Sequence, residues 1–378
     1  MQSKKHSVTV VGAGVSFLIG ASALAQDAGD LWVVGFSSSN AVLFDGVTGA
    51  PTGIVASGGG LSGAHSVTVG PDANLYVTSF NNGRVIRFDG QTGAFIDRFV
   101  WNDPAVPGNE TGGLVSPADV VFDGGFMYVA SLGNDRVLRY NGATGAFIDV
   151  FVWDDPATGA IDESGGLDET EFLNFAPNGM LYIASGGTDE VLRFDGSTGA
   201  FIDKLVFDDP GTVPDESAGL NNPHGFAFGP GGDLFISSFL TNQVLRFDGT
   251  TGLPVSAFVP VSAGAVRPHD TAFDADGNLY VASFNSNDVR KFAPDGTPLG
   301  VFASGAGLNL ASGMAFVPPA PCPADLAEPF GVLDFSDVVA FLTAFGSMDP
   351  AADLAPPVGV FDFSDVVAFL GSFGAGCP

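Results

Sequence analysis

Basic residues and long apolar runs are scarce in this chain, and each scarcity excludes a class of protein. Only 13 of its 378 residues are Lys or Arg, against 42 Asp and Glu. Such an acidic chain repels phosphate backbones and anionic lipid headgroups, so nucleic acid and membrane surfaces are unsuitable partners. Beyond residue 25 no apolar run reaches the ~20 residues that a membrane-spanning helix needs. We therefore expect no membrane span in the mature chain.

The longest apolar run lies at the N-terminus, where it has the three parts of a secretory signal peptide. A basic start, Lys4-Lys5, precedes an apolar stretch over residues 8–24, which ends in the small-residue sequence Ala23-Leu24-Ala25. We predict a signal peptide over residues 1–25 and a mature chain that is secreted or held at the cell surface. That chain has 42 acidic and 11 basic residues, a net charge of −31, which favours cations, cationic surfaces and neutral ligands as partners.

Cysteine occurs only twice, at Cys322 and Cys377, both in the last segment. The rest of the chain therefore has no thiol nucleophile, and it also lacks the G-x-S-x-G and phosphate-loop motifs. An even cysteine count in an exported chain favours pairing, so we predict a Cys322–Cys377 disulfide. The alternative is two free thiols, and neither has a second Cys or a His near enough in sequence to indicate a metal site.

A repeated unit occupies most of the remaining sequence. One copy reads Leu75-Tyr-Val-Thr-Ser-Phe80, then Val85-Ile-Arg-Phe-Asp-Gly90, then Thr92-Gly-Ala-Phe-Ile-Asp97. An equivalent aromatic residue recurs every 44 to 54 residues, at Phe44, Phe88, Tyr140, Phe194, Phe247 and Phe292. Short runs rich in Val, Ile, Phe and Tyr alternate with Asp-Gly-x-Thr-Gly turns. Each unit therefore predicts four short strands, the content of one β-propeller blade.

Six such units predict an all-β, six-bladed propeller of four-stranded blades over residues 26–318. The first unit lacks an inner strand, while the last inner strand, Gly313 to Val317, lacks the three outer strands that should follow it. Pairing these incomplete units would close the ring between N-terminal outer strands and a C-terminal inner strand, leaving no open sheet edge. A proline-rich linker, residues 319–321, then leads to a separate tail, residues 322–378.

The unit resembles the NHL repeat, and the propeller is similar to those of streptogramin lyases, peptidyl-hydroxyglycine amidating lyases and gluconolactonase-like proteins. The resemblance covers about residues 30–318 and is specific for the fold. Because no complete catalytic constellation is present, we favour an extracytoplasmic binding or scaffold propeller, with a small molecule, peptide or glycan at its mouth. The alternative is a metal-dependent lyase or lactonase that acts at the central channel.

The candidate site is a ring of residues at the start of each inner strand. The six equivalent positions hold His65, Ala118, Glu171, His224, His269 and Ser312. Equivalent positions of a propeller converge on its channel, and three of the four histidines of the chain occupy this one. Imidazoles with a carboxylate suit zinc or a similar divalent metal, so the three histidines and Glu171 are predicted ligands. The resemblance to the amidating lyases, which place zinc on channel histidines, also implies a metal here. The alternative is that these rings bond only to neighbouring backbone or water.

Other charged residues have a simpler interpretation. Cations share one repeat position and aspartates share a position on the next strand: Arg87, Arg139, Arg193, Arg246 and Lys291, with Asp97, Asp149 and Asp203. Cross-strand pairing on a solvated blade surface explains them better than an anion site. Three acidic connections that start at Trp101, Trp153 and Phe207 match no defined calcium loop, and we favour solvated loops over calcium sites there.

The tail contains two copies of one sequence, Ala324 to Leu342 and Ala352 to Leu370. They resemble the tandem calcium loops of dockerins, in the Cys-bracketed form found in exported proteins of planctomycete-like bacteria. The resemblance implies attachment to an unknown protein or cell-surface partner, and it implies calcium ligands at Asp325, Asp334, Asp337, Asp353, Asp362 and Asp365. Each loop departs from the dockerin pattern, because it is one residue longer and lacks carboxylates at its third and fifth positions.

An apolar helical run follows each tail loop. In the first copy, Val338, Phe341, Leu342 and Phe345 are predicted to share one helix face, so that two helices pack together under the Cys322–Cys377 disulfide.

The isolated tail is expected to lose its helical structure when reduction and chelation are combined. From Cys322 onward it carries eight acidic residues and no basic ones, which repel one another without a cation, and a segment of about 57 residues buries little core unaided. Far-UV circular dichroism with a thiol reductant and EDTA measures the change. An unchanged helix signal would show that neither the disulfide nor the cation supports this fold.

Overall fold

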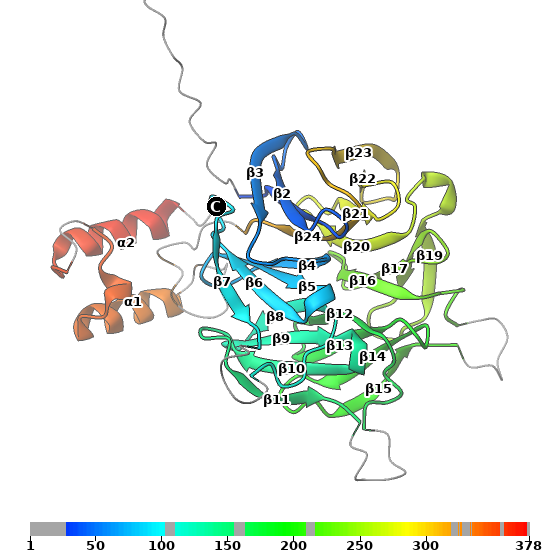
Figure 1. Cartoon of the computed structure of the whole chain (residues 1–378). Coiled ribbons are helices and arrows are strands. Elements are labelled where there is room, and N and C mark those ends of the chain that lie inside the picture. Colours follow the sequence, from blue (N-terminus) through cyan, green and yellow to red (C-terminus); the bar gives the residue numbers. More distant parts are fainter. Residues whose placement is uncertain are drawn as a thin grey trace, which may run out of the picture.

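The computed structural model describes residues 28–102, 110–154, 163–208, 216–318, 324, 326, 333, 335–355 and 359–375. Within these residues the chain forms 24 β-strands, grouped into six four-stranded antiparallel sheets around a common centre, and two α-helices (Figure 1). The predicted all-β, six-bladed propeller is confirmed. The predicted signal peptide and both cysteines, Cys322 and Cys377, lie outside the described residues.

Each blade is named here from its inner strand outward. Blade 1 consists of β24 (Ala311–Phe316), β1 (Leu31–Gly35), β2 (Asn40–Phe44) and β3 (Pro51–Ser57). Blade 2 consists of β4 (Ala64–Val69), β5 (Leu75–Ser79), β6 (Arg84–Phe88) and β7 (Phe95–Val100). Blade 3 consists of β8 (Pro117–Asp123), β9 (Phe126–Ser131), β10 (Arg136–Asn141) and β11 (Phe147–Val152). Blade 4 consists of β12 (Thr170–Phe175), β13 (Met180–Ser185), β14 (Glu190–Asp195) and β15 (Phe201–Val206). Blade 5 consists of β16 (Pro223–Phe228), β17 (Leu234–Ser238), β18 (Gln243–Phe247) and β19 (Pro254–Val259). Blade 6 consists of β20 (Pro268–Phe273), β21 (Leu279–Ser283), β22 (Asp288–Phe292) and β23 (Pro298–Ser304).

The ring closes in blade 1, where strands from the two ends of the domain share one sheet. β24 pairs antiparallel with β1, with Leu31 opposite Phe316. The pairing continues past the strands, since the Val317 N–H donates to the Asp30 carbonyl at 2.7 Å. The predicted closure is therefore confirmed, although β24 starts two residues before the expected Gly313.

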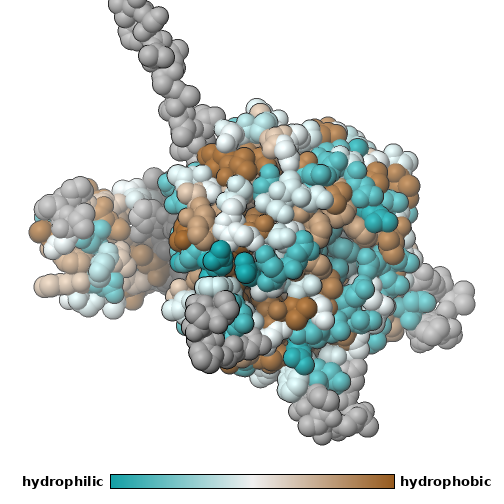
Figure 2. Space-filling model, viewed as in Figure 1, coloured by the Kyte–Doolittle hydropathy of each residue, from teal (hydrophilic) through white to brown (hydrophobic). Residues whose placement is uncertain are grey.

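The core lies between neighbouring blades. The second strand of each blade is buried on both faces; in β5 all five residues are buried, because each blade is covered by another on either side. One cluster joins Trp32 of blade 1 to Val77 and Ile86 of blade 2. Burial falls toward the outer strands, and on the face in Figure 2 hydrophobic residues form several separate patches among hydrophilic ones. Continuous apolar runs in the second strand follow from this arrangement.

The repeated Asp-x-x-Thr-Gly turn connects two outer strands of one blade and packs against the preceding blade. In blade 4 the backbone N–H and hydroxyl of Thr198 donate to Asp195 at 2.8 and 2.9 Å, and these bonds lower the pKa of that carboxyl. Gly199 follows with φ +75°, and a Cβ there would lie 2.0 Å from the Phe151 carbonyl oxygen of blade 3. Only glycine permits both this backbone conformation and this approach.

Cross-strand charge pairs form in three blades as predicted. The Arg87–Asp97, Arg139–Asp149 and Arg193–Asp203 pairs have N···O distances of 2.7, 2.6 and 2.6 Å.

In blades 5 and 6 the equivalent cations pair elsewhere. Arg246 and Lys291 lie opposite Ser256 and Gly300, which carry no charge. They contact turn carboxylates instead, at 2.6 Å for Arg246–Asp233 and 3.1 Å for Lys291–Asp274. The expectation of one shared pattern is wrong for these two cations.

The tail forms helices α1 (Phe335–Ser347) and α2 (Phe363–Ala375). They pack through stacked Phe341 and Phe369 rings, whose centroids are 4.2 Å apart. Leu342 is 59% exposed, so its predicted place on the packing face is wrong. The buried stripe passes through Val338, Phe341 and Phe345, and Leu342 lies to one side of it. No helix in the described residues is long and apolar enough to cross a membrane.

We expect residues 26–320 to fold without the tail, because β24 completes blade 1 before the linker begins. A matched chain that ends at residue 310 lacks β24 and leaves the edge of β1 unpaired, so it should aggregate or fail to fold. Thermal unfolding followed by circular dichroism compares the two. An unfolded 26–320 chain would place the domain boundary elsewhere.

Candidate functional site

A β-bulge in every inner strand directs two consecutive residues toward the channel. In β4 the pairing with β5 shifts between Ala64 and Val67, and each of the other inner strands has a register shift near its start. The predicted ring position is the second residue of each strand as it is formed, not the first. The bulge re-aims this residue and the one after it, as bulges beside functional sites commonly do.

The bulges bring together the four predicted ligands. The His269 ring centroid lies 4.5 Å from that of His224 and 4.7 Å from that of His65. Glu171 completes the group, with Oε2 3.8 Å from His65 Nε2 and Oε1 3.6 Å from His224 Nε2. The histidines come from blades 2, 5 and 6 and the glutamate from blade 4. Four side chains that are distant in sequence therefore meet at the axis.

The other two ring positions hold small residues that leave space for the imidazoles. The Ser312 hydroxyl donates to the Ala64 carbonyl at 3.0 Å. At the other small position, in blade 3, the carbonyl of Ala118 accepts a hydrogen bond from His65 Nδ1 at 2.8 Å. This bond assigns the proton of His65 to Nδ1 and leaves the Nε2 lone pair facing Glu171.

Burial disfavours charge on the ring residues. His65, Glu171, His224 and His269 are 5%, 4%, 6% and 2% exposed. Desolvation lowers the pKa of His65 to about 4. It also lowers the pKa values of His224 and His269 well below the ordinary value, and the mutual repulsion that the ring histidines would have if charged is a smaller cause. Desolvation also raises the pKa of Glu171 well above its ordinary range. Neutral imidazoles are the form in which histidine binds metals.

Several polar atoms of the cluster have no partner. Glu171 Oε2, His224 Nδ1 and His269 Nδ1 are buried without a hydrogen bond to any described residue. Buried polar atoms in native proteins are nearly always bonded to protein, ordered water or an ion. As the side chains stand, no three or more His, Cys, Asp or Glu residues of the described chain have a metal-binding arrangement. The cluster therefore has the donor atoms and the unpartnered polar atoms that a metal site needs. Its side chains are not arranged around a common point as they would be in a complete coordination shell.

A collar of phenylalanines surrounds the histidines, and the sequence analysis missed it. Phe80, Phe239 and Phe284 each stack on a ring histidine, with centroids 5.1, 4.2 and 5.2 Å apart, and Phe36 contacts Phe80 and Phe284. These phenylalanines each follow the second strand of a blade. The signal was the repeated Ser-Phe ending of that strand, visible at Phe80, Phe239 and Phe284.

The collar is incomplete in blades 3 and 4, where the equivalent residues are Leu132 and Gly186. Gly186 adds no side chain over Glu171, and a Cβ there would come 3.2 Å from Glu171 Cγ. The histidines are thus covered by aromatic rings, while the glutamate is not.

Two buried aspartates follow the ring residues and join neighbouring blades; the sequence analysis missed these as well. Asp119 accepts hydrogen bonds from the Ser66 hydroxyl at 2.6 Å and from the Leu173 N–H at 3.1 Å, which links blades 2, 3 and 4. Asp270 accepts from the Met314 N–H of blade 1 at 2.9 Å. Burial raises the pKa of Asp119 and raises that of Asp270 to about 8.

The described tail aspartates are engaged in hydrogen bonds within their own loops. Asp337 accepts from the Leu326 N–H at 2.8 Å. Asp365 accepts from the N–H groups of Leu354 and Asp362 at 2.8 and 2.9 Å. Backbone hydrogen bonds, that from Asp362 foremost, lower the pKa of Asp365.

Of the other four predicted tail ligands, two also accept hydrogen bonds within their loops and two lie outside the described residues. Asp353 accepts from the Gly359 N–H, and Asp362 accepts from Ser364. Asp325 and Asp334 lie outside the described residues. Calcium binding by the tail stays a prediction.

Comparison with known proteins shows which solved structures share this fold. No protein-family model and no curated protein matches the chain. Among solved structures, virginiamycin B lyase from Staphylococcus aureus is 13% identical with a TM-score of 0.52, over 78% of this chain and 87% of that one. These similarities show the fold alone.

Two further structures extend the comparison beyond lyases. A chain of a nidogen/laminin complex is 13% identical with a TM-score of 0.57, over 75% of this chain and 97% of that one. A protein of unknown function from Bacteroides caccae is 14% identical with a TM-score of 0.53, over 76% and 98%. The predicted resemblance to lyase propellers therefore holds for the fold, which other kinds of protein share.

Replacing Asp119 with alanine is expected to destabilise the propeller by roughly 2–4 kcal/mol, because it leaves the buried Ser66 hydroxyl and Leu173 N–H without their acceptor. Asp119→Asn keeps one acceptor oxygen and should cost less. Asp123→Asn, an exposed change on the same strand, is the matched control. Denaturant unfolding compares the free energies of unfolding of the variants. Equal values for Asp119→Ala and Asp123→Asn would show that the hydrogen bonds of Asp119 do not stabilise the propeller.

Proposed function

We propose that the mature chain is an extracytoplasmic ligand-binding propeller whose channel holds a zinc-like divalent metal on His65, His224, His269 and Glu171. The observation that carries this proposal is the convergence of three neutral imidazoles and a carboxylate, three of whose polar atoms are buried and unpartnered. A divalent cation would give these atoms a partner. Its charge would also favour the ionised form of Glu171, which burial alone disfavours.

The ligand would bind at the mouth of the channel. A metal held by protein on one side can accept a carbonyl or carboxylate oxygen on the other. The Phe collar would contact the apolar part of that ligand. These features suit a small molecule, a peptide or a glycan with an apolar group. The likeness to a chain of a nidogen/laminin complex supports a binding role.

The tail would attach the propeller to a protein or cell-surface partner. Its two sequence copies form equivalent helices that pack through equivalent phenylalanines. The predicted Cys322–Cys377 disulfide and calcium would stabilise this small unit. The predicted signal peptide, residues 1–25, supports export, which both the disulfide and an external partner require.

A metal-dependent lyase or lactonase is the second candidate. It is favoured by the likeness to virginiamycin B lyase, for which a catalytically inactive histidine-to-alanine variant with quinupristin is also similar to this chain. In that case the channel metal would polarise a substrate carbonyl. Metal-dependent turnover of a chromogenic lactone would favour the enzyme, whereas saturable binding without turnover would favour the binding protein.

The purified mature chain is expected to bind one zinc ion per molecule. His65→Ala, His224→Ala and His269→Ala should each weaken zinc binding by at least roughly 10-fold, because each removes a ligand. Ser312→Ala, at the same repeat position, is the matched control and should bind zinc normally. Elemental analysis and calorimetric titration, with excess calcium to occupy the tail, measure this. Equal zinc binding by the triple histidine variant would exclude the channel site.

A further inference from the structure

Two arginines of blade 2 lack the acidic partners that most cations of this chain have. Of the 11 basic residues after residue 25, seven form ion pairs: Arg87, Arg139, Arg193, Lys204, Arg246, Arg290 and Lys291. The other four, Arg84, Arg98, Arg136 and Arg267, form no ion pair with the described residues. Because the chain has 42 acidic residues, cations without a partner require an explanation.

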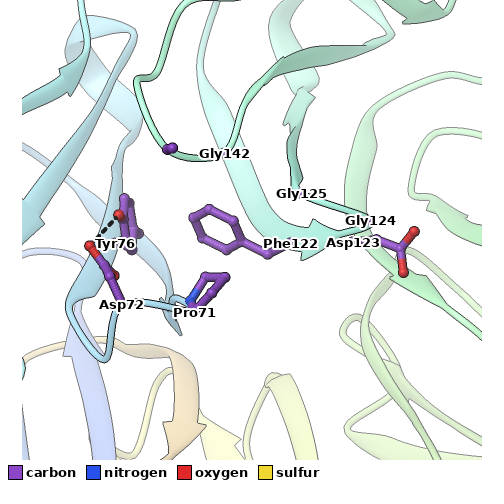
Figure 3. A pocket seen from close by; sticks show the side chains of 9 residues that line it. Pro71, Asp72, Tyr76, Phe122, Asp123, Gly124, Gly125 and Gly142 are labelled. Carbon is purple, nitrogen blue, oxygen red and sulfur yellow. Dashed lines mark hydrogen bonds between the residues drawn. The ribbon is translucent and has the colours of Figure 1, made fainter. Parts of the chain in front are cut away.

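Arg87 shows how this chain usually satisfies a guanidinium group. It contacts Asp97 at 2.7 Å and Asp72 at 3.4 Å. Asp72 also accepts a hydrogen bond from the Tyr76 hydroxyl at 3.0 Å, drawn as a dashed line beside the pocket in Figure 3. The guanidinium of Arg87 therefore needs no external partner, unlike that of the arginine at the start of the same strand.

Arg84 and Arg98 lie on the same face of blade 2. Arg98 is opposite Ile86 in the β6–β7 pair, and Ile86 is two residues after Arg84. Opposite residues and residues two apart on a strand share a face of the sheet. A Cβ at Gly60 would lie 3.0 Å from Nη1 of Arg84 and 3.8 Å from Nε and Nη2 of Arg98. Both guanidinium groups therefore border one point of the loop that connects blade 1 to blade 2.

This loop holds Arg98 in place but leaves most of its donors free. Arg98 Nε donates to the Gly59 carbonyl at 2.8 Å, and Asn82 Nδ2 donates to the Gly60 carbonyl at 2.7 Å. The guanidinium carbon of Arg98 also lies 5.3 Å from the centre of the Trp101 ring, a favourable cation–π contact. Because the bond to Gly59 uses Nε, both terminal nitrogens of Arg98 are available to a ligand.

Blade 4 has opposite charges at the same two positions. Glu190 starts β14 as Arg84 starts β6. Lys204 takes the place of Arg98, opposite the third residue of that strand. The Lys204 ammonium donates to both Glu190 carboxylate oxygens, at 2.7 and 2.8 Å. Side chains at these positions therefore reach one another, and blade 4 supplies its own anion where blade 2 does not.

Among the six described blades, only blade 2 has cations at both positions. The equivalent pairs in the other blades are Asn40 with Val55, Arg136 with Val150, Gln243 with Ala257 and Asp288 with Val301. Neighbouring like charges on one face of a sheet are destabilising. The repeat does not impose this repulsion on blade 2, and an anion between the two guanidinium groups would remove it.

The chemistry of the two side chains indicates which anion fits. Guanidinium groups bind oxyanions through pairs of parallel hydrogen bonds. Two of them carry two positive charges, which match one doubly charged anion. The oxygens of a tetrahedral anion point in several directions, so that one sulfate or phosphate group can accept hydrogen bonds from both arginines. A long polyanion is disfavoured, because it would also meet the field of a chain with a net charge of −29.

We propose that Arg84 and Arg98 bind a sulfate or phosphate group, either as the free ion or as a monoester on a small molecule. Its oxygens accept hydrogen bonds from the Arg84 guanidinium and from the terminal nitrogens of Arg98. The Asn82 side chain, which is bonded to Gly60, borders the same point. This site uses no residue of the histidine ring, so it does not depend on the metal proposed for the channel.

Phosphorus NMR of inorganic phosphate, titrated with the full mature chain at mildly alkaline pH and constant ionic strength, tests the proposal. Saturable binding is expected, with a Kd of about 1 mM or tighter. Sulfate should displace the phosphate, whereas acetate, with a single charge, should compete at least roughly 5-fold less well. Glucose 6-phosphate distinguishes the two sources, because equal affinity indicates a monoester ligand and much weaker affinity indicates the free ion.

Variants assign the binding to the two arginines. Arg84→Gln and Arg98→Gln should each weaken phosphate binding by roughly 10-fold, because each removes charge-assisted hydrogen bonds. Arg84→Glu gives blade 2 the charges of blade 4, so it should abolish phosphate binding without lowering the melting temperature. Arg136→Gln, at the equivalent position of blade 3, is the matched control and should bind phosphate normally. His224→Ala, which alters the channel, should also bind it normally.

Thermal melts confirm that each variant folds. Four results would overturn the proposal: no saturable binding of phosphate to the unmodified chain, equal competition by acetate and sulfate, unchanged phosphate affinity in Arg84→Glu, or loss of binding in Arg136→Gln or His224→Ala.

Discussion

Each blade can bury both of its faces only if another blade lies on either side, and this requirement governs the whole molecule. A row of blades would leave two faces exposed to water, whereas a closed ring leaves none. The β24–β1 pairing meets the requirement in blade 1, and the Asp-Thr-Gly turns bring the backbones of adjacent blades into contact. Closure in turn places six inner strands around one axis. Residues more than 200 positions apart, such as His65 and His269, therefore come into contact.

Convergence at the axis has an electrostatic cost. A ring of titratable side chains is withdrawn from water, so its histidines are held neutral and Glu171 is disfavoured as an anion. Part of the polarity is satisfied within the protein, as in the bond from His65 to the Ala118 carbonyl. The remainder is not, since Glu171, His224 and His269 each keep a buried atom without a partner. The divalent metal that we propose would give these atoms a partner, and it would also explain why three histidines share one repeat position.

Features that follow from the regular repeat could be predicted from the sequence. Features that arise where a strand or a residue departs from that repeat could not. Period and strand pattern predicted six blades, their closure and the ring of residues that converges. The pattern could not predict Asp119 or Asp270, because bulges turn two consecutive residues inward where strand alternation places only one. Arg246 found a different partner from Arg87, since its own opposite residue is uncharged.

The central claim is that the converging side chains form a metal site, and anomalous diffraction tests it most directly. Crystals of the mature chain grown with zinc should give, in data collected on both sides of the zinc absorption edge, one strong peak on the channel axis. The account predicts that peak within about 2.0–2.1 Å of nitrogen atoms from His65, His224 and His269. An axis that holds only water at saturating zinc, with the three rings hydrogen-bonded to it, would contradict the account.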